Sequence, residues 1–180
     1  MFWPVNSYYF ITAKTFLGYK LFDSSAKKDL VFQQIKKAVE KLNVKIYSYS
    51  IAQNHYHCLI FLNSYSKHEK FKQLVNGGSS YLYHEIYGQT ETGGKMWLDC
   101  KTLVIYNQTA LFKVIGYIDG NLLKHGEVKN FDDLYDNKYS SFKQHADKYG
   151  RGTMQGVIDQ VIYTEEDDGG SMDLKTFNSG

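Results

Sequence analysis

The chain has 180 residues, of which 43 % are hydrophobic and 22 % charged. This length and balance predict one globular domain with a sizeable core, and the absence of a long apolar stretch argues against a membrane-spanning protein. The net charge of +2 conceals an acidic end, because residues 163–180 carry five acidic side chains and one basic one, which leaves +6 on residues 1–162. We expect a single basic domain over residues 1–162, suited to a polyanionic partner, and a mobile acidic tail over residues 163–180.

The first half of the chain predicts a strand, a helix and a hairpin. Residues 8–16 are rich in β-branched and aromatic side chains, as strands are. Cap residues at 23–25 and an apolar stripe predict a helix that ends at Asn43. Residues 44–53 alternate like a strand and lead directly into the apolar strand at residues 54–62.

The second half predicts a helix at residues 67–87, broken or kinked by the glycines at 77–78, and a strand at residues 96–106. A third helix follows at residues 108–125, and residues 130–152 look irregular or briefly helical. The order β-α-β-β-α-β predicts an α+β, ferredoxin-like (RRM-like) fold. Two helices would cover one face of its antiparallel sheet, and the third helix would lie on the other face.

His55 and His57 stand at the head of the apolar strand. Alternate side chains of a strand share a face, so the two imidazoles lie on one side, about 7 Å apart at roughly 3.3 Å per residue, where they could hold one metal ion. A surface pair without function is the alternative, because a lone His-x-His motif is weak evidence. The position in a core strand favours a function, since an unpartnered histidine there would be costly.

Tyr117 and Asn121 lie one turn apart on the helix at residues 108–125, beside its apolar stripe. On the open face of the sheet, this helix would aim both side chains at the histidines, with Asn121 as a third metal ligand and Tyr117 beside the metal. A boundary tyrosine and a helix-end asparagine are the alternative.

These motifs resemble the single-tyrosine HUH endonucleases, and more closely the REP-associated tyrosine transposases and their insertion-sequence relatives. The matching segments are Asn54 to Leu62 with the HUH motif His55-Tyr56-His57, Gly94 and Trp97 before the fourth strand, Tyr117-Ile118-Asp119-Gly120-Asn121, and Tyr139-Ser140-Ser141-Phe142. The resemblance covers about residues 8–145. Leu122 replaces the family's usual proline, and Arg151 is the only arginine, which affects the expected DNA sequence preference more than the chemistry.

The resemblance implies DNA transposition by cutting and rejoining single-stranded DNA, which can fold into hairpins. Tyr117 would be the nucleophile and would form a 5′-phosphotyrosine, while His55, His57 and Asn121 would hold Mg²⁺ or Mn²⁺. It leaves open whether Tyr117 serves the histidines of its own chain or those of a second copy in a homodimer. Two other classes stay open: a replication or mobilisation nickase with the same chemistry, and a non-enzymatic RRM-like nucleic-acid-binding module.

His125 is a candidate to assist removal of the tyrosine proton, with an ordinary surface or core position as its alternative. Three other tyrosines compete with Tyr117 for the role of nucleophile, but none has a potential ligand four residues on: Tyr106, Tyr135 and Tyr139.

Five lysines are candidate phosphate contacts and one tryptophan is a candidate stacking platform for bases: Lys14, Lys95, Lys101, Lys113, Lys124 and Trp97. A solvated surface position for each lysine and a core position for Trp97 are the alternatives. Cys58 and Cys100 lie in strand-like apolar segments and predict buried thiols of a reducing compartment. With no signal peptide recognisable, we expect a cytoplasmic protein that associates with the bacterial nucleoid while it acts.

Overall fold

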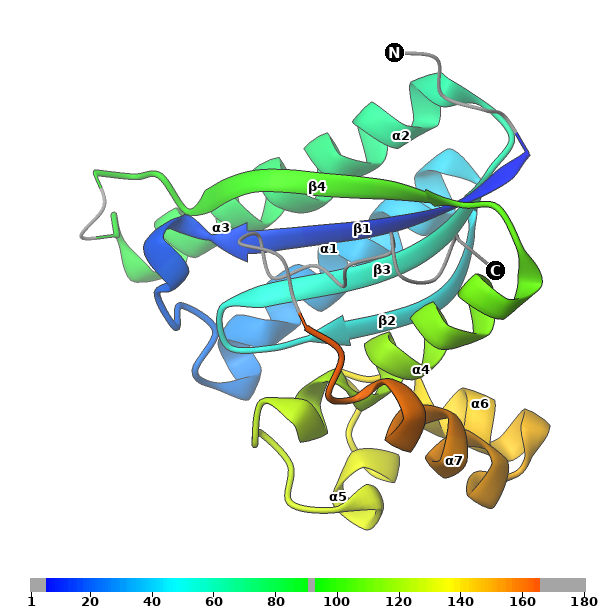
Figure 1. Cartoon of the computed structure of the whole chain (residues 1–180). Coiled ribbons are helices and arrows are strands. Elements are labelled where there is room, and N and C mark those ends of the chain that lie inside the picture. Colours follow the sequence, from blue (N-terminus) through cyan, green and yellow to red (C-terminus); the bar gives the residue numbers. More distant parts are fainter. Residues whose placement is uncertain (1–5, 91–92, 166–180) are drawn as a thin grey trace.

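The computed structural model describes residues 6–90 and 93–165 and contains one four-stranded sheet with helices on both faces (Figure 1). The predicted tail lies outside the described residues except at positions 163–165. The strands are β1 (Ser7–Thr15), β2 (Lys45–Ile51), β3 (His55–Leu62) and β4 (Trp97–Ile105). The helices that alternate with them are α1 (Ser25–Leu42), α2 (Tyr65–Lys72) and α3 (Gly78–Tyr87), followed after β4 by α4 (Gln108–Lys124).

The sheet has the order β2-β3-β1-β4, and every neighbouring pair of strands is antiparallel. Each βαβ unit therefore has a strand inserted between its two parallel members, which is the split arrangement that the element order predicted. The two central strands are β3 and β1. The predicted α+β class with an antiparallel sheet is thus confirmed.

Helix α1 begins and ends where its cap residues predicted. The Ser24 side chain accepts a hydrogen bond from the backbone N–H of Lys27, and Asn43 closes the helix in the left-handed conformation, with φ of 47°. The predicted helix at residues 67–87 is not broken at its glycines. Gly77 and Gly78 both keep right-handed helical angles, and the turn Gln73–Gly77 (η2) widens into a π-helix between α2 and α3.

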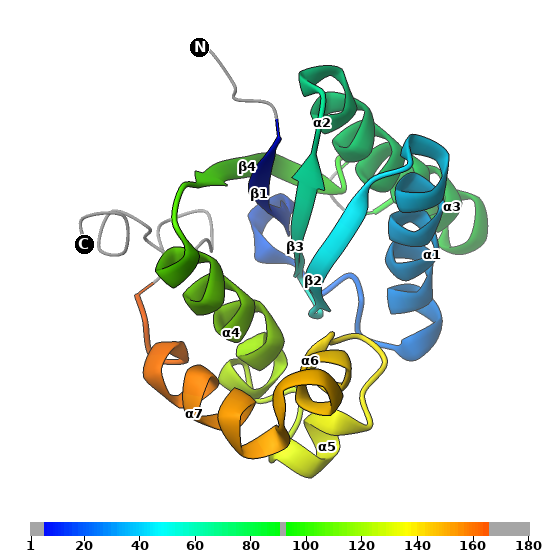
Figure 2. The ribbon, with the colours of Figure 1, turned by 90° about the vertical axis from the view of Figure 1, so that its right-hand side faces the viewer.

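The two faces of the sheet are covered differently (Figure 2). Helices α1, α2 and α3 lie on one face, and α4 lies on the other, where it crosses β2 and β3. Because β3 is covered on both sides, all but one of its residues are buried, as its continuous apolar run predicted. None of the described helices is long and apolar enough to span a membrane.

Three further helices pack beside α4: α5 (Phe131–Tyr135), α6 (Phe142–Tyr149) and α7 (Arg151–Val161). The short helices α5 and α6 agree with the expectation for residues 130–152. Helix α7 was not predicted, because Gly152 and Gly156 lower its helix propensity, and its contacts with α4 and α6 stabilise it instead. The approach to α4 is close: a Cβ on Gly116 would lie 2.7 Å from Cγ1 of Val157.

Candidate active site

Two histidines at the start of β3 form the centre of the candidate site. His55 is 5 % exposed and His57 is fully buried, and their ring centroids lie 4.9 Å apart. Both face α4, because His57 packs against Tyr117 and His55 contacts Asn121. The alternation of a single strand therefore places both imidazoles on the face where the sequence predicted the third helix.

Hydrogen bonds at Nδ1 orient both rings. Asn54 donates from Nδ2 to the carbonyl oxygen of Gly18 (3.2 Å), so its Oδ1 is the atom that faces Nδ1 of His55 at 2.7 Å. An amide oxygen only accepts, and His55 therefore carries a proton on Nδ1. Oγ1 of Thr12 lies 2.8 Å from Nδ1 of His57. These contacts present Nε2 of each histidine as the ligand atom, the arrangement typical of metal-binding histidines.

Asn121 supplies an oxygen to this pair. Its Oδ1 lies 3.0 Å from Nε2 of His55, while its buried Nδ2 has no hydrogen-bond partner among the described residues. With its proton on Nδ1, the His55 imidazole can present the lone pair of Nε2 toward the Asn121 oxygen, and two such electron-pair donors suit a cation. No group of three or more His, Cys, Asp or Glu side chains in the described part of the chain could hold a metal ion. The imidazoles of His55 and His57 together with the amide oxygen of Asn121 do fit a metal ion, with mixed nitrogen and oxygen ligation.

Tyr117 lies beside His57 of the same chain. The two ring centroids are 5.3 Å apart, and the tyrosine ring also meets Phe10 edge to face at 6.1 Å. The Lys124 ammonium stands 5.0 Å from the centroid of the Tyr117 ring and donates a hydrogen bond to the carbonyl oxygen of Thr164. Tyr117 is only 1 % exposed, so the side chains that cover it, Lys124 among them, have to move before its hydroxyl can reach a large substrate.

His125 also belongs to this cluster, although its sequence position gave no strong reason to place it there. Its ring centroid lies 4.8 Å from that of His55, and the side chain is exposed. It caps the C-terminus of α4, with its N–H bonded to the carbonyl oxygen of Asn121. The available signal was its spacing, one helical turn beyond Asn121, which keeps the two side chains on one flank of α4.

The competing tyrosines lie elsewhere. The Tyr139 hydroxyl donates to the carbonyl oxygen of Ser25, and the Tyr135 hydroxyl donates to Oδ1 of Asp147. Tyr106 is 73 % exposed after the end of β4. Of these four candidate tyrosines, Tyr117 is the one whose ring contacts a histidine of the pair, namely His57.

Lysines flank the histidines across the sheet. In the strand register, His57 is opposite Thr12 on β1, and Thr12 is opposite Lys101 on β4. Side chains directly opposite each other share a face, so Lys101 lies on the histidine face. Lys14 is opposite His55 and lies on that face too. On α4, Lys113 is one turn before Tyr117, and Lys124 stands over the tyrosine ring.

Two of the predicted DNA contacts lie outside this group. Lys95 is exposed before β4, with its Nζ 4.8 Å from the centroid of the Phe16 ring. Trp97 is 8 % exposed, packs against Phe22 and Tyr56, and donates its indole N–H to Oγ of Ser79. It occupies the core position that was its alternative, and we do not include it among the proposed DNA contacts.

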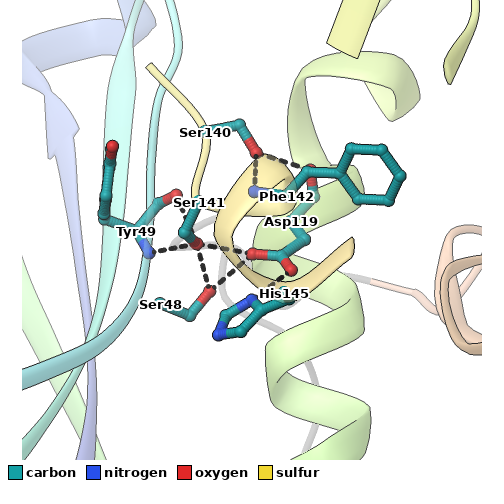
Figure 3. Close-up of polar contacts among 7 residues, drawn as sticks. All are labelled: Ser48, Tyr49, Asp119, Ser140, Ser141, Phe142 and His145. Atoms are coloured by element: carbon teal, nitrogen blue, oxygen red, sulfur yellow. Dashed lines mark hydrogen bonds and ion pairs between the residues drawn. The ribbon is translucent and has the colours of Figure 1, made fainter. Parts of the chain in front are cut away.

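A buried polar network fixes α4 behind the site (Figure 3). The carboxyl group of Asp119, which is fully buried, accepts hydrogen bonds from Ser48 on β2 (2.9 Å) and from Ser141 (2.5 Å), and its other oxygen lies 2.6 Å from Nδ1 of His145. Ser140 donates to the Asp119 carbonyl oxygen. An unpartnered carboxyl group is costly in a core, so Asp119 within an apolar helix was the available signal for this network.

The chain is similar to known transposases in sequence and in fold. The family model described as "Transposase IS200 like" matches residues 6–121. A solved REP-associated tyrosine transposase bound to a REP hairpin aligns with a TM-score of 0.61 and 17 % identity, covering 82 % of this chain and 84 % of that one.

Two further solved structures each align with a TM-score of 0.49 and 12 % identity. A putative transposase from Deinococcus radiodurans covers 61 % of this chain and 86 % of its own. A tRNA(His) guanylyltransferase from Saccharomyces cerevisiae covers 90 % and 73 %. No curated protein matches the chain.

Proposed function

Because the chain belongs to the IS200-like transposase family, we propose that it carries out DNA transposition by cutting and rejoining single-stranded DNA, with Tyr117 as the nucleophile. The observation that carries this proposal is the position of Tyr117 within one chain. Its ring lies 5.3 Å from that of His57, and Asn121, one turn further along α4, reaches His55. The candidate nucleophile and the three candidate ligands are therefore neighbours within one chain, which supports a site that needs no residue from a second copy, and a homodimer stays a prediction.

The reaction exchanges one phosphodiester for another. The Tyr117 oxygen attacks the phosphorus, its proton leaves to a nearby base or to water, and the bond to the 3′ oxygen of the preceding nucleotide breaks. The products are a 5′-phosphotyrosyl linkage and a 3′-hydroxyl, which takes up a proton. Attack by the 3′-hydroxyl of another strand reverses these steps and joins the strands. Since the bond energy is kept in the linkage, no nucleoside triphosphate is required.

His55, His57 and Asn121 would hold a divalent cation, Mg²⁺ or Mn²⁺, beside the nucleophile. Such an ion, when bound, acts as a Lewis acid that draws negative charge away from a phosphate oxygen. The chain contributes the orientation: Asn54 and Thr12 fix the imidazoles, and the hydrogen bonds of Asp119 hold α4 at its place on the sheet. Because Asn121 and Tyr117 share α4, a cation held by Asn121 would stay beside the nucleophile.

Four lysines around the site are the proposed contacts to the phosphates of the DNA. Lys14 and Lys101 on the histidine face, and Lys113 and Lys124 on α4, border the site from two sides and suit the phosphates of a strand that passes between them. Binding has to uncover the Tyr117 ring, and Lys124 is the side chain that stands over it. The structural relative was solved with a REP hairpin, and a hairpin with a single-stranded end is accordingly the substrate to test first.

The decisive experiment looks for a covalent protein–DNA adduct. End-labelled hairpin oligonucleotides with single-stranded flanks are incubated with the protein and Mn²⁺ or Mg²⁺ and run on a denaturing gel. We expect an adduct for the unchanged chain that is lost in Tyr117→Phe and with EDTA. Tyr106→Phe, which alters an exposed tyrosine away from the histidines, is the matched control and should retain the adduct.

Two further results would change the proposal. An adduct that survives in Tyr117→Phe would identify another tyrosine as the nucleophile. DNA binding without cleavage on every substrate would favour the RRM-like binding module instead. Metal binding is measured separately by titration with Mn²⁺, and Asn121→Ala should weaken it about tenfold or more, the size of effect seen when a site loses a ligand or its support.

A further inference from the structure

A cavity of about 340 Å³ lies between the start of α1 and the end of α3. Its volume is in the range of pockets that bind small ligands. Six of the side chains that line it are three tyrosines, two lysines and an aspartate: Tyr19, Tyr83, Tyr87, Lys20, Lys27 and Asp23. None of them has a part in the chemistry proposed above.

The tyrosines offer stacking surfaces. Tyr19 and Tyr87 are each 42 % exposed, whereas Tyr83 is 7 % exposed and forms the inner wall, with its ring centroid 5.1 Å from that of Tyr87. Every nucleobase has a π-face, and stacking on aromatic side chains is how proteins bind unpaired bases with little regard to sequence. Exposed tyrosines around a cavity suit such a ligand.

The polar groups distinguish a nucleotide from a bare anion. Nζ of Lys27 stands over the rings of Tyr83 and Tyr87 and pairs with the Asp23 carboxylate at 3.0 Å, while Lys20 is exposed at the rim. The Asp23 carboxylate, which lines the cavity at its exposed edge, disfavours a free phosphate there but accepts a hydrogen bond from the amino group of a base. The lysines at the rim suit the phosphate of the same nucleotide.

The cavity is connected to the histidine site through a short segment of backbone. Tyr19 follows Gly18, whose carbonyl oxygen binds Asn54, and Asn54 in turn contacts Nδ1 of His55 at 2.7 Å. The Lys14 side chain runs past this segment, with its Cε 3.7 Å from the point where a side chain on Gly18 would begin. A strand leaving the cation site can therefore follow Lys14 around the end of the sheet to Tyr19.

From these observations we infer that the cavity binds the base of an unpaired nucleotide close to the cleaved phosphodiester, and that it positions the strand for attack. This inference rests on the proposed function, because it takes the strand at the histidines to be DNA. It assigns Tyr19 and Tyr87 to base stacking and Asp23 to the amino group of the base.

Binding is measured without cleavage, so that this inference and the proposed function fail separately. Hairpin oligonucleotides carry a single 2-aminopurine, or a single abasic residue, at each flanking position in turn, and EDTA prevents cutting. We expect one position at which 2-aminopurine fluorescence is quenched and the abasic residue weakens binding about tenfold, a size consistent with one stacked base. In Tyr19→Ala/Tyr87→Ala both effects should disappear.

Tyr81→Ala is the matched control, because Tyr81 is a 66 % exposed tyrosine of α3 that does not line the cavity, and it should behave as the unchanged chain does. Both altered tyrosines of the test variant are partly exposed, so folding is retained and can be verified by thermal melting. Quenching that persists in the double variant, or equal affinity of the double variant and Tyr81→Ala for every oligonucleotide, would overturn the inference. Quenching without any adduct in the cleavage assay would support base binding in the cavity and contradict the proposal that Tyr117 is the nucleophile.

Discussion

Replacing Asp119 by alanine should destabilise the protein more than any single serine substitution in its network. The carboxyl group of Asp119 is fully buried and ties three segments to α4: β2 through Ser48, the segment before α6 through Ser141, and α6 through His145. Alanine removes every one of these side-chain contacts together. The hydrogen bond from the Ser140 hydroxyl to the Asp119 backbone carbonyl oxygen remains.

The loss in free energy of unfolding depends on whether each donor to the Asp119 carboxyl group finds another hydrogen-bond acceptor in the variant. A buried donor that loses its acceptor costs about 1–3 kcal/mol. Ser141 can still donate to the Tyr49 carbonyl oxygen (3.2 Å), and His145, at 8 % exposure, can reach water, so neither bears the full cost. Ser48 keeps only its contact with the Ser141 hydroxyl. The free energy of unfolding should therefore fall by about 3 kcal/mol for Asp119→Ala and about 1 kcal/mol for Ser48→Ala.

Urea unfolding followed by circular dichroism measures both values, and a thermal melt should show a decrease of about 6–12 °C for Asp119→Ala in a chain of this length. The double variant tests the coupling: its loss should be smaller than the sum of the two single losses, because the Ser48 contact cannot be lost twice. A loss for Asp119→Ala no larger than that for Ser48→Ala, or strictly additive losses, would show that the network does not hold α4 as described.

Two further predictions concern packing and thiol chemistry. Gly116→Ala should lower the free energy of unfolding by about 1–3 kcal/mol, because its Cβ would press on Val157 at 2.7 Å, whereas Gly156→Ala on α7, with open space around it, should raise stability by about 0.5–1 kcal/mol in the same urea titration. Equal effects of the two substitutions would contradict the close approach of α4 and α7. Burial raises the pKa of the Cys100 thiol to about 11 and that of Cys58 well above its ordinary value, so few thiolates exist at pH 8 and iodoacetamide should label the native protein slowly and the unfolded protein rapidly. Cys58 is buried as expected, whereas Cys100 is only half-buried, so rapid labelling of Cys58 in the native chain, read by mass spectrometry, would contradict this prediction.

The sequence determined those features that depend on local periodicity. The alternation of a strand put His55 and His57 on one face, and the helical repeat put Tyr117 and Asn121 on one flank, so each pair could be read from its own segment. Capping residues likewise located both ends of α1. Helix α7 was not predicted, because its stability comes from contacts with α4 and α6 and not from the helix propensity of its own residues.

Tertiary structure alone decided which segments meet. Ser48 and Ser141 are 93 residues apart in the chain, yet their hydroxyls lie 2.9 Å from each other beside Asp119. Trp97 lies in the core, and the spacing of His125 along α4 placed it on the flank of Asn121 but could not show that its ring meets that of His55. Periodicity fixes the direction of a side chain relative to its own backbone, whereas its neighbours depend on how distant elements pack, because burial and hydrogen bonding are satisfied only in the assembled core.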